Sequence, residues 1–483
     1  MPQPSRRILF ALNEPGYFRL YGSTISELAH RGWEVALLYD KPDRRGPDLA
    51  VPPNSPDNVR SLGAFPGQVS PPAVMLRTAV DCIRYLEPAF AHARYLRRRA
   101  EKHLPPALGF LKSIPRLPRP VVSAAIALAR GAERHLPVDR QVLEFVRDLR
   151  PNVVMVSPVV IIGGSGAQET ETLKAAHVLG VPTVVGVASW DHLTSKGLIR
   201  TVPDAVMVWN DIQAREAEHL HRIPRSRIVV TGAPSFDRWF DAAQPAGIET
   251  LRRTLGIDAG RRVLLLVGSS RNMAPGDSEV RFVRRWLAAL RVSHIPDVRD
   301  AFVIVRPHPG NTEPWQHADL DDARAVVHPR GYASGVLFTD ADVETFRDSL
   351  LASSAVVGVN TTAMIEAAVV RRPVFSVRDP QFAHSQQQTL HFAYLSADEG
   401  GFAVVSASLS EHVRQLERLF TAGEADLRAS DRFVARFVRP LGMTTSATTQ
   451  LCDAIERVAG IGRFRRAPAE PPVDVADATS AGR

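Results

Sequence analysis

Cysteine and lysine are both scarce in this 483-residue sequence. Only Cys82 and Cys452 are present, far apart and without metal-type spacing, which excludes a disulfide scaffold or a zinc finger and is typical of a reducing compartment. Lysine occurs only at positions 41, 102, 112, 174 and 196, so arginine carries nearly all of the positive charge. The planar guanidinium group suits recognition of phosphate or carboxylate.

Long hydrophobic runs are also missing. The longest lipid-compatible run, Val121 to Ala129, is far shorter than the roughly 20 residues that cross a bilayer. Near the start, the apolar run that follows Arg7 ends at once in Asn13, Glu14 and Pro15, so it lacks the length of a signal peptide. We therefore expect a cytoplasmic protein.

Aromatic residues are few, at 7% of the chain, but 45% of the residues are apolar and only 23% are charged. This composition predicts a large core of Ala, Val and Leu and excludes global disorder. The length is about three times that of a typical domain, which excludes one small module and favours two packed domains.

Short runs rich in Val and Ile alternate with helical patterns, which is typical of parallel sheets covered by helices. The opening unit predicts a strand over Arg7–Leu12, a helix to about Arg31 and a strand over Glu34–Tyr39. More strands of this first series are predicted at Val153–Ser157, Thr183–Val187, Ala205–Trp209 and Ile228–Thr231. A second series is predicted at Val263–Val267, Phe302–Val305, Ala355–Val359, Val374–Val377 and Phe402–Val405. The fold class is therefore α/β, with two Rossmann-like domains.

The pattern breaks near Asp241–Ile248, between the two series. We predict a first domain over residues 1–241 and a second over 248–430. Helices are predicted over 431–463, followed by a disordered tail over 464–483. Residues 70–147 carry helical stretches broken by prolines, and we expect them to be an insertion in the first domain.

The insertion is strongly basic. Between Arg84 and Arg147, 13 Lys and Arg residues stand against 5 Asp and Glu, a surplus of 8 that equals the surplus of the whole chain. One interpretation is a contact with an anionic membrane surface. The residues that would make it are Arg97, Arg98, Arg99 and Lys102, with Leu104, Leu108, Phe110 and Leu111 nearby. The plainer alternative is a set of solvated helices, and no nucleic-acid partner is expected because no nucleic-acid motif accompanies the charge.

The segment after the predicted strand Ala355–Val359 has the pattern of an anion site. Thr361 and Thr362 precede a helix whose N-terminal amides would face a diphosphate, and their hydroxyls are expected to cap that helix. Glu366 lies four residues after Thr362, on the same helix face, where it would accept hydrogen bonds from ribose hydroxyls. Taken alone, the pattern also fits a plain N-cap and a solvated glutamate.

Arg306 and His308 follow another predicted strand, at the edge where ligands of open α/β sheets gather. Held rigid by the prolines beside them, these two side chains would form a cationic clamp for a leaving phosphate. Arg271 would face the same crevice, although a surface arginine is the plainer interpretation. Asp340 and Asp342 fit a helix start better than a metal-binding pair, so no metal site is predicted.

Asp191 and His192 follow the predicted strand Thr183–Val187, at the position of a general base. Either side chain would take a proton from an attacking hydroxyl, and the alternative is a turn held by an aspartate cap. Asn13 and Gly16 follow the opening strand without the dinucleotide-binding spacing, and we assign them to acceptor binding.

Together these segments resemble enzymes of the two-Rossmann-domain (GT-B) glycosyltransferase superfamily. The stretch from Trp209 to Asp237, with Thr231-Gly232 and Pro234, is similar to the domain-closing stretch of bacterial CDP-glycerol glycerophosphotransferases and of non-hydrolysing UDP-N-acetylglucosamine 2-epimerases. Trp190 to Lys196 is similar to the transferase signature Trp-His-Gly-x-Pro-Leu-Lys, whose histidine is implicated as the base. Asp191 takes the place of that histidine, and His192 comes one residue later.

The resemblance implies two domains that face across a cleft. It also implies an enzyme that moves a sugar or glycerol-phosphate unit from a nucleotide-diphosphate donor to a hydroxyl acceptor, in cell-envelope or surface polysaccharide synthesis. The donor would be a substrate rather than a cofactor, and no metal would be needed. The residues that would bind the donor are Arg271, Arg306, His308, Thr361, Thr362 and Glu366. A lipid-linked acceptor would place the protein at the inner face of the plasma membrane.

Two alternatives stay open, a nucleotide-sugar 2-epimerase and a non-catalytic nucleotide-binding module. Two epimerase motifs are replaced here, by Ser269–Asn272 and by Val187–Trp190. Because the carboxylates needed for proton shuttling at a sugar carbon are missing from them, transfer is favoured over epimerisation.

Overall fold

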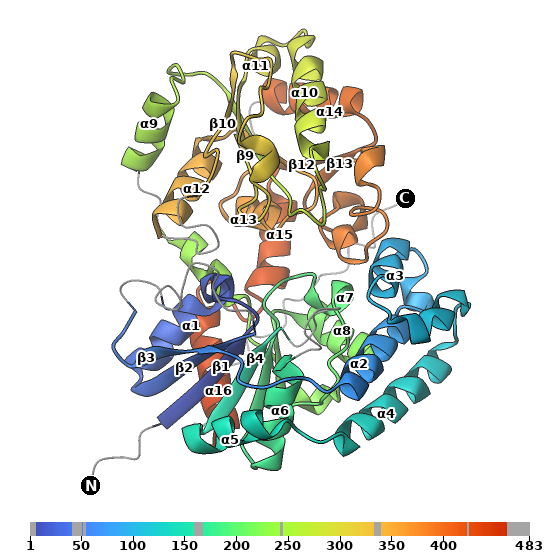
Figure 1. Ribbon diagram of the computed structural model, residues 1–483. Helices are drawn as coiled ribbons and strands as arrows, with labels where there is room; N and C mark the ends of the chain where they lie inside the picture. Colours follow the sequence, from blue (N-terminus) through green and yellow to red (C-terminus); the bar gives the residue numbers. More distant parts are fainter. Residues whose placement is uncertain are drawn as a thin grey trace, which may run out of the picture.

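The structure is a computed structural model in which two α/β domains lie one above the other (Figure 1). It describes residues 6–40, 51, 55–158, 168–241, 245–332, 340–422 and 425–460. The predicted tail over 464–483 and residues 242–244 of the predicted boundary lie outside these ranges.

The first domain is built on a seven-stranded parallel sheet of order β3-β2-β1-β4-β5-β6-β7. Its strands are β1 (Arg6–Leu12), β2 (Trp33–Tyr39), β3 (Val59–Ala64), β4 (Val153–Ser157), β5 (Thr183–Gly186), β6 (Ala205–Val208) and β7 (Ile228–Val230). The strand order reverses between β1 and β4, and in sheets of this kind ligands bind beyond the strand ends at that point.

Side chains of β1 alternate between the two faces of this sheet, as the period of a strand requires. Ile8 and Phe10 pack in one apolar cluster with helices α1 (Phe18–His30) and α16 (Ala447–Val458). Leu9 packs in another cluster with α5 (Arg140–Leu149), α6 (Gln168–Val178) and α8 (Asp211–His221). Both faces are therefore covered, which explains why these strands read as continuous apolar runs.

The second domain repeats the plan with six parallel strands of order β10-β9-β8-β11-β12-β13. They are β8 (Val263–Val267), β9 (Phe302–Arg306), β10 (Ala325–Val327), β11 (Ala355–Gly358), β12 (Val374–Val377) and β13 (Val404–Ser406). The helices of this domain are α9 (Pro245–Thr254), α10 (Ser278–Arg291), α11 (Pro296–Arg299), α12 (Asp340–Ala352), α13 (Ala363–Val369), α14 (Leu409–Ala422) and α15 (Arg428–Phe433). The order reverses between β8 and β11, so the loops after these strands form the second switch point.

The α/β prediction with two Rossmann-like domains is confirmed. The predicted strands Val153–Ser157, Val263–Val267 and Val374–Val377 match β4, β8 and β12 residue for residue. The edge strands β3 and β10 were not predicted. The prediction Phe402–Val405 is shifted, because Phe402 packs against the ring of Phe433, 4.6 Å between centroids, and β13 begins only at Val404.

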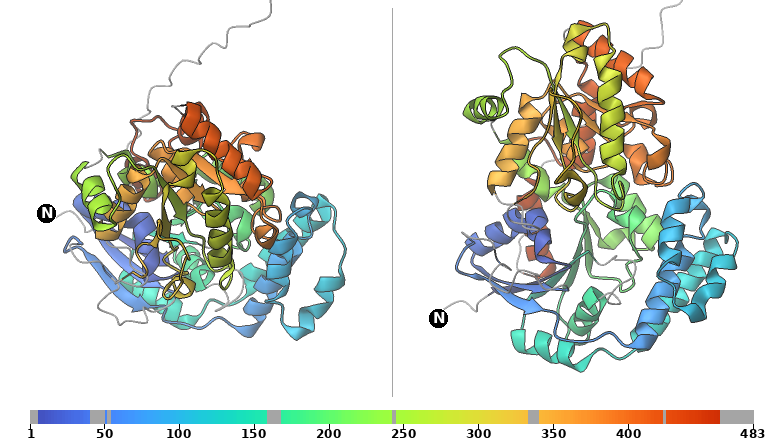
Figure 2. Two further views of the ribbon diagram at one scale, coloured as in Figure 1. Left: turned by 90° about the horizontal axis from the view of Figure 1, so that it is seen from above. Right: turned by 45° about the horizontal axis from the view of Figure 1, so that its top comes forward.

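The helices between β3 and β4 form a lobe at one edge of the first domain, drawn in light blue in Figure 2. They are α2 (Pro71–Arg84), α3 (Arg94–Glu101) and α4 (Arg119–His135), with short 3-10 turns between them. The last helix of the predicted insertion, α5, packs on the sheet through Val142 and Val146. The projecting part is therefore α2–α4, shorter than the predicted 70–147.

The end of the chain returns to the first domain. A π-helical turn, Val434–Val438, leads from α15 toward α16. Asp237 of the first domain accepts hydrogen bonds from the backbone N–H groups of Ala447 and Thr448, at the start of α16. Arg31 of α1 then pairs with Asp453 at 2.7 Å.

Candidate functional site

The strand ends of the two domains meet through a small set of polar and apolar contacts. The indole Nε1 of Trp190 donates to Oγ1 of Thr362, 3.2 Å away. Thr194 Oγ1 lies 3.2 Å from Nδ1 of His391. Trp190 also belongs to the apolar core that holds Met364 of α13. The loop after β5 is therefore in direct contact with loops after β11 and β12.

The carboxylate of Asp191 is held by its own loop. Ser189 Oγ donates to Oδ1 at 2.6 Å and Ser195 Oγ donates to Oδ2 at 2.7 Å. Asp191 precedes α7 (His192–Ser195), but its side chain makes no cap bond to the backbone. Burial alone would raise the pKa of this carboxyl, but attraction to His192 and His391, which are protonated at low pH, and to Lys196 holds it well below its usual range. Asp191 is thus an ionised carboxylate that braces a turn.

His192 has a different environment. It is buried, its ring centroid lies 6.3 Å from that of Tyr17, and its Nδ1 has no hydrogen-bond partner. Burial lowers the pKa of His192 to about 4 against the attraction of Asp191, with Lys196 and Arg99 acting in the same direction as burial. The imidazole is therefore neutral near pH 7, with a ring nitrogen that its own loop does not use.

His391 completes this group and was not predicted. Its ring packs edge-on against Trp190 with centroids 4.9 Å apart, and its Nε2 lies 3.4 Å from Nδ2 of Asn360. Burial lowers its pKa to about 4 as well. No local pattern around His391 could have identified it, since its role depends on contact with the other domain.

The loop after β1 lies beside the same residues. Asn13 donates its backbone N–H to the carbonyl of Ser157 at the switch point, and its buried Oδ1 has no hydrogen-bond partner. Gly16 is buried in the 3-10 turn Pro15–Tyr17. Burial raises the pKa of Tyr17, with Glu14 and Asp191 adding to the shift. The loop that carries Asn13 and Gly16 therefore reaches His192 through Tyr17.

Arg306 is nearly completely buried at the end of β9. It donates to the carbonyl of Asp342 at 3.0 Å and stacks over the ring of Phe346 at 4.9 Å. Burial lowers the pKa of Arg306, against the attraction of Tyr332, Asp342 and Glu366. The guanidinium is thus anchored on α12, and its positive charge acts on the carboxyl group of Glu366.

His308 is neutral, which corrects the predicted cationic clamp. Its Nδ1 accepts a hydrogen bond from the N–H of Gly310 at 2.9 Å, so the ring proton is on Nε2. Burial, together with the charge of Arg19, lowers the pKa of His308 to about 3. His308 can therefore offer an anion a neutral N–H donor but no charge. Gly268 lets its loop approach, because a Cβ there would lie 2.7 Å from the backbone nitrogen of His308.

Glu366 lies in the field of three arginines. Burial raises its pKa to about 7, while Arg19, Arg238 and Arg306 oppose the shift. Arg19 comes from the first turn of α1 and accepts at its carbonyl a hydrogen bond from Arg238 at 3.0 Å. The prediction did not include Arg19 or Arg238, because nothing in the sequence places them near the second domain.

The two threonines do not cap α13, which corrects another expectation. Thr362 is the N-cap residue, but its side chain makes no cap hydrogen bond and accepts from Trp190 instead. Thr361 is buried, and its carbonyl accepts from the N–H of Met364 at 3.2 Å. Thr362 therefore joins the two domains.

Arg271 lies on the surface. Its side chain is 64% exposed and pairs with Glu313 at 3.0 Å. Among the predicted donor residues, the charge of Arg19 acts on both His308 and Glu366, and the charge of Arg306 also acts on Glu366. Arg271 is not part of this group, because it pairs with Glu313.

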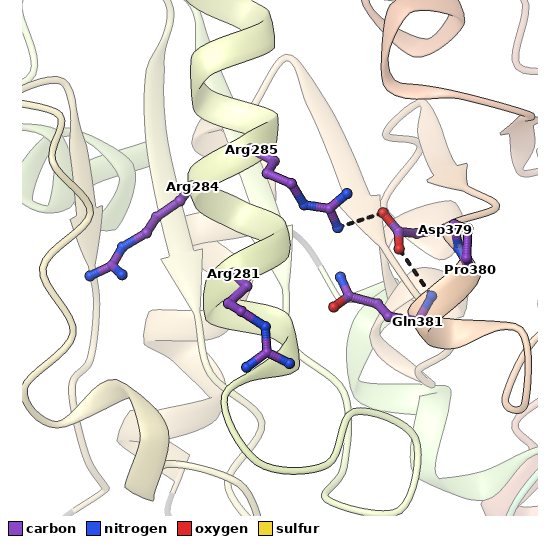
Figure 3. A pocket seen from close by; sticks show the side chains of 6 residues that line it. All are labelled: Arg281, Arg284, Arg285, Asp379, Pro380 and Gln381. Atoms are coloured by element: carbon purple, nitrogen blue, oxygen red, sulfur yellow. Dashed lines mark hydrogen bonds and ion pairs between the residues drawn. The ribbon is translucent and has the colours of Figure 1, made fainter.

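A recess of about 550 Å³ lies between α10 and the loop after β12 (Figure 3). Its lining residues are Arg281, Arg284, Arg285, Asp379, Pro380 and Gln381. Arg285 pairs with Asp379 at 2.6 Å, and Arg284 points away from the other five side chains. None of the predicted site residues belongs to this lining.

Within the described ranges, no three or more His, Cys, Asp or Glu side chains are grouped so that they could hold a metal ion. None of the helices in that part of the chain is both long and apolar enough to cross a membrane.

No family model matches the chain. A curated relative is the UDP-N-acetylglucosamine--N-acetylmuramyl-(pentapeptide) pyrophosphoryl-undecaprenol N-acetylglucosamine transferase 2 of Bacillus thuringiensis (strain Al Hakam), 27% identical over 221 residues, which are 44% of this chain and 54% of that protein. The corresponding transferase of Bacillus cytotoxicus is 27% identical over 203 residues, 41% of this chain and 50% of that protein. The chain thus spans about half the length of the curated relatives it matches.

Solved structures match nearly the whole chain at low identity. The match to a UDP-N-acetylglucosamine 2-epimerase covers 98% of this chain and 100% of the epimerase chain, with a TM-score of 0.52 and 10% identity. The match to a glycosyltransferase from Rickettsia africae covers 94% of this chain and 99% of the glycosyltransferase chain, with a TM-score of 0.50 and 10% identity. A likeness at this identity concerns the fold. The chain has a two-domain α/β fold of the GT-B type, as its sequence motifs implied.

Proposed function

We propose that this protein is a glycosyltransferase-like enzyme that moves a sugar or glycerol-phosphate unit from a nucleotide-diphosphate donor to a hydroxyl acceptor in cell-envelope synthesis. The observation that carries the proposal is the contact between the loop after β5 and the loops after β11 and β12. It brings the neutral His192 and the carboxylate of Asp191 against the domain that holds Arg306, His308 and Glu366. The names of the curated relatives, which are transferases that act on a lipid-linked acceptor, support the same class.

In the proposed reaction, His192 takes the proton of the acceptor hydroxyl as that oxygen attacks the donor. A neutral imidazole accepts a proton, and the nearby carboxylate of Asp191 stabilises the resulting cation. Asp191 itself is the weaker candidate for the base, because both of its oxygens already accept from serine hydroxyls.

The diphosphate of the donor, which carries the leaving group, would be bound from both domains. The Nε2–H of His308 and the guanidinium of Arg19 are its proposed partners, and the charges of Arg238 and Arg306 add to the favourable field. Glu366, when ionised, would accept from the ribose hydroxyls. These groups stabilise the developing charge in the proposed mechanism without a metal ion.

A thermal-shift panel of UDP, CDP, GDP and dTDP, repeated on Arg19→Gln, tests the donor site. One nucleotide should raise the melting temperature of the wild type and should raise it less in the variant. A nucleotide shift that is equal in both proteins would contradict the proposed diphosphate site.

Epimerisation is the second candidate, because an epimerase is among the structures of the same fold. The products distinguish the two reactions. A transferase releases the nucleoside diphosphate if it moves a sugar, or the nucleoside monophosphate if it moves glycerol phosphate, whereas an epimerase keeps the nucleotide attached to the sugar. Chromatography of the bound donor after incubation with and without acceptor measures this directly. Nucleotide binding without either product would favour the non-catalytic module.

We also propose that the projecting helices attach the protein to an anionic membrane. Along α4, Val121 and Leu128 are seven residues apart on one helix face, and Leu128 is 76% exposed. Phe110 is also exposed, whereas Leu104 and Leu111 are buried, so the predicted apolar contact is narrower than the sequence suggested. Exposed arginines on α3 would attract anionic lipid.

Sedimentation with vesicles that contain phosphatidylglycerol tests the attachment. Leu128→Asp should weaken the binding, and Val292→Asp, which changes an equally exposed valine in the second domain, should not. Equal binding by wild type and Leu128→Asp would overturn this part of the proposal.

A further inference from the structure

The projecting helices also make contacts inside the molecule, beginning at the end of α2. Arg84, in the last turn of α2, is fully buried. Its guanidinium donates to three backbone carbonyls, those of Leu193, Lys196 (2.7 Å) and Gly197 (2.6 Å). These carbonyls belong to α7 and the turn after it, directly following His192.

Neighbouring residues of α2 hold the same segment. The hydroxyl of Tyr85 donates to the carbonyl of Lys196. Asp81 accepts from the N–H of Leu198 at 2.8 Å and pairs with the guanidinium of Arg200. The buried backbone of residues 193–200 thus finds hydrogen-bond partners on α2, and leaving such groups unpaired would cost about 1–3 kcal/mol each.

The next helix touches the second domain. Tyr95 of α3 donates its hydroxyl to the carbonyl of Asn272 at 3.0 Å, and its ring lies edge-on to His384 with centroids 5.1 Å apart. Asn272 follows β8, and His384 follows β12, so both are in loops at the strand ends of the second sheet. Figure 1 shows α3 beside the upper domain.

One apolar cluster joins these two sets of contacts. Tyr85, Phe90 and Leu96 pack together in it, and Leu390 of the second domain packs against them. Leu390 directly precedes His391, the residue that contacts Thr194. The helices therefore reach the base-bearing loop and the opposite domain through the same core.

We propose that α2–α3 is a strut that fixes the loop of Asp191 and His192 relative to the second domain, with Arg84 and Tyr95 as its positioning residues. The mechanical part of this inference does not depend on the reaction. Its consequence for turnover rests on the proposed function, because it assumes that His192 must be aligned with a donor held by the other domain.

Hydrogen exchange of the whole ligand-free protein tests the strut directly. Tyr95→Ala should raise amide exchange in residues 191–200 and 384–392 by roughly fivefold, which corresponds to the loss of about one hydrogen bond. Arg98→Ala is the matched control, because it changes an exposed residue of the same helix. Faster exchange confined to α3, or no change at all, would overturn the inference. Tyr95→Phe, which keeps the ring, should give a smaller effect in the same two segments.

Kinetics then test the consequence for turnover. Arg84→Lys keeps the charge but loses the forked geometry, and should lower kcat roughly tenfold with little change in the donor KM, as expected for a misplaced base. An increase in KM with kcat unchanged would contradict a positioning role. If the wild type turns over no donor at all, the proposed function fails while the exchange experiment still decides whether the strut exists.

Discussion

The two domains share one strand order but carry different groups on the loops that follow their strands. After β5 of the first sheet, a neutral buried histidine lies beside a carboxylate whose oxygens accept from two serines. After β9 and β11 of the second sheet come a neutral histidine that can donate through Nε2 and a glutamate in the field of three arginines. One fold therefore supplies proton chemistry on one side of the interface and charge stabilisation on the other, and the loops rather than the strands make the difference.

The comparison predicts its largest effect at His192. His192→Ala should lower turnover by about 10²–10⁴-fold, the usual contribution of a general base. His135→Ala, which changes an exposed histidine at the end of α4, should have no effect. Asp191→Asn should lose less activity, because the amide can still accept from one of the two serines. If Asp191→Asn abolishes turnover and His192→Ala does not, the carboxylate is the base.

The next effect concerns Arg19, a first-domain residue whose charge acts on both Glu366 and His308 of the second domain. Arg19→Gln should weaken nucleotide binding by roughly tenfold or more, as expected when a hydrogen bond to a charged group is lost. Isothermal titration with the nucleotide found by thermal shift measures this. Arg324→Gln is the control. Arg324 pairs with Asp300 at 2.6 Å and directly precedes β10, so it lies at the edge of the second sheet where the strands begin, opposite the proposed site. Equal affinities in all three proteins would remove Arg19 from the site.

A smaller effect should appear in the pH dependence of binding. Because the pKa of Glu366 is raised to about 7, the carboxylate form increases as the pH rises from 6 to 8. If that form accepts from the ribose, affinity should increase severalfold over this range, and Glu366→Gln should lose the increase. The variant also controls for ionisation of the nucleotide phosphates, which affects both proteins. If affinity changed with pH equally in the wild type and in Glu366→Gln, Glu366 would not contact the nucleotide.

The smallest effect is expected at the contact between the domains. Thr362→Val removes the acceptor of the Trp190 indole and should lower the free energy of unfolding by about 1 kcal/mol. Denaturant titration measures it, with Thr421→Val on the exposed end of α14 as the comparison. A variant as stable as the wild type would mean that this hydrogen bond contributes nothing measurable to the contact between the domains.

The sequence predicts the central strands well because their physical signal is local. β8 reads VLLLV and is buried throughout, as a strand covered on both faces must be. The edge strand β3 reads VRSLGA and is mostly partly exposed, so its composition does not separate it from a loop. The three-residue β10 is too short to carry a pattern.

The candidate site was predictable only where it follows a strand. Asp191, Arg306 and Glu366 were predicted because strand ends of parallel sheets gather at one edge. Arg19 and His391 depend on the packing of one domain against the other, which no local pattern records. The protonation of His308 could not be read from its neighbours in sequence either, because burial sets it.

The polypeptide passes between the domains twice, first after the 3-10 turn Pro234–Phe240 and again between α15 and α16. Two connections restrain the relative movement of the domains more than one connection would. A single proteolytic cut in either passage would leave the halves covalently joined by the other. Separating them as independent fragments would require cutting both, and the piece that carries α16 would still be bound through Arg31 and Asp237.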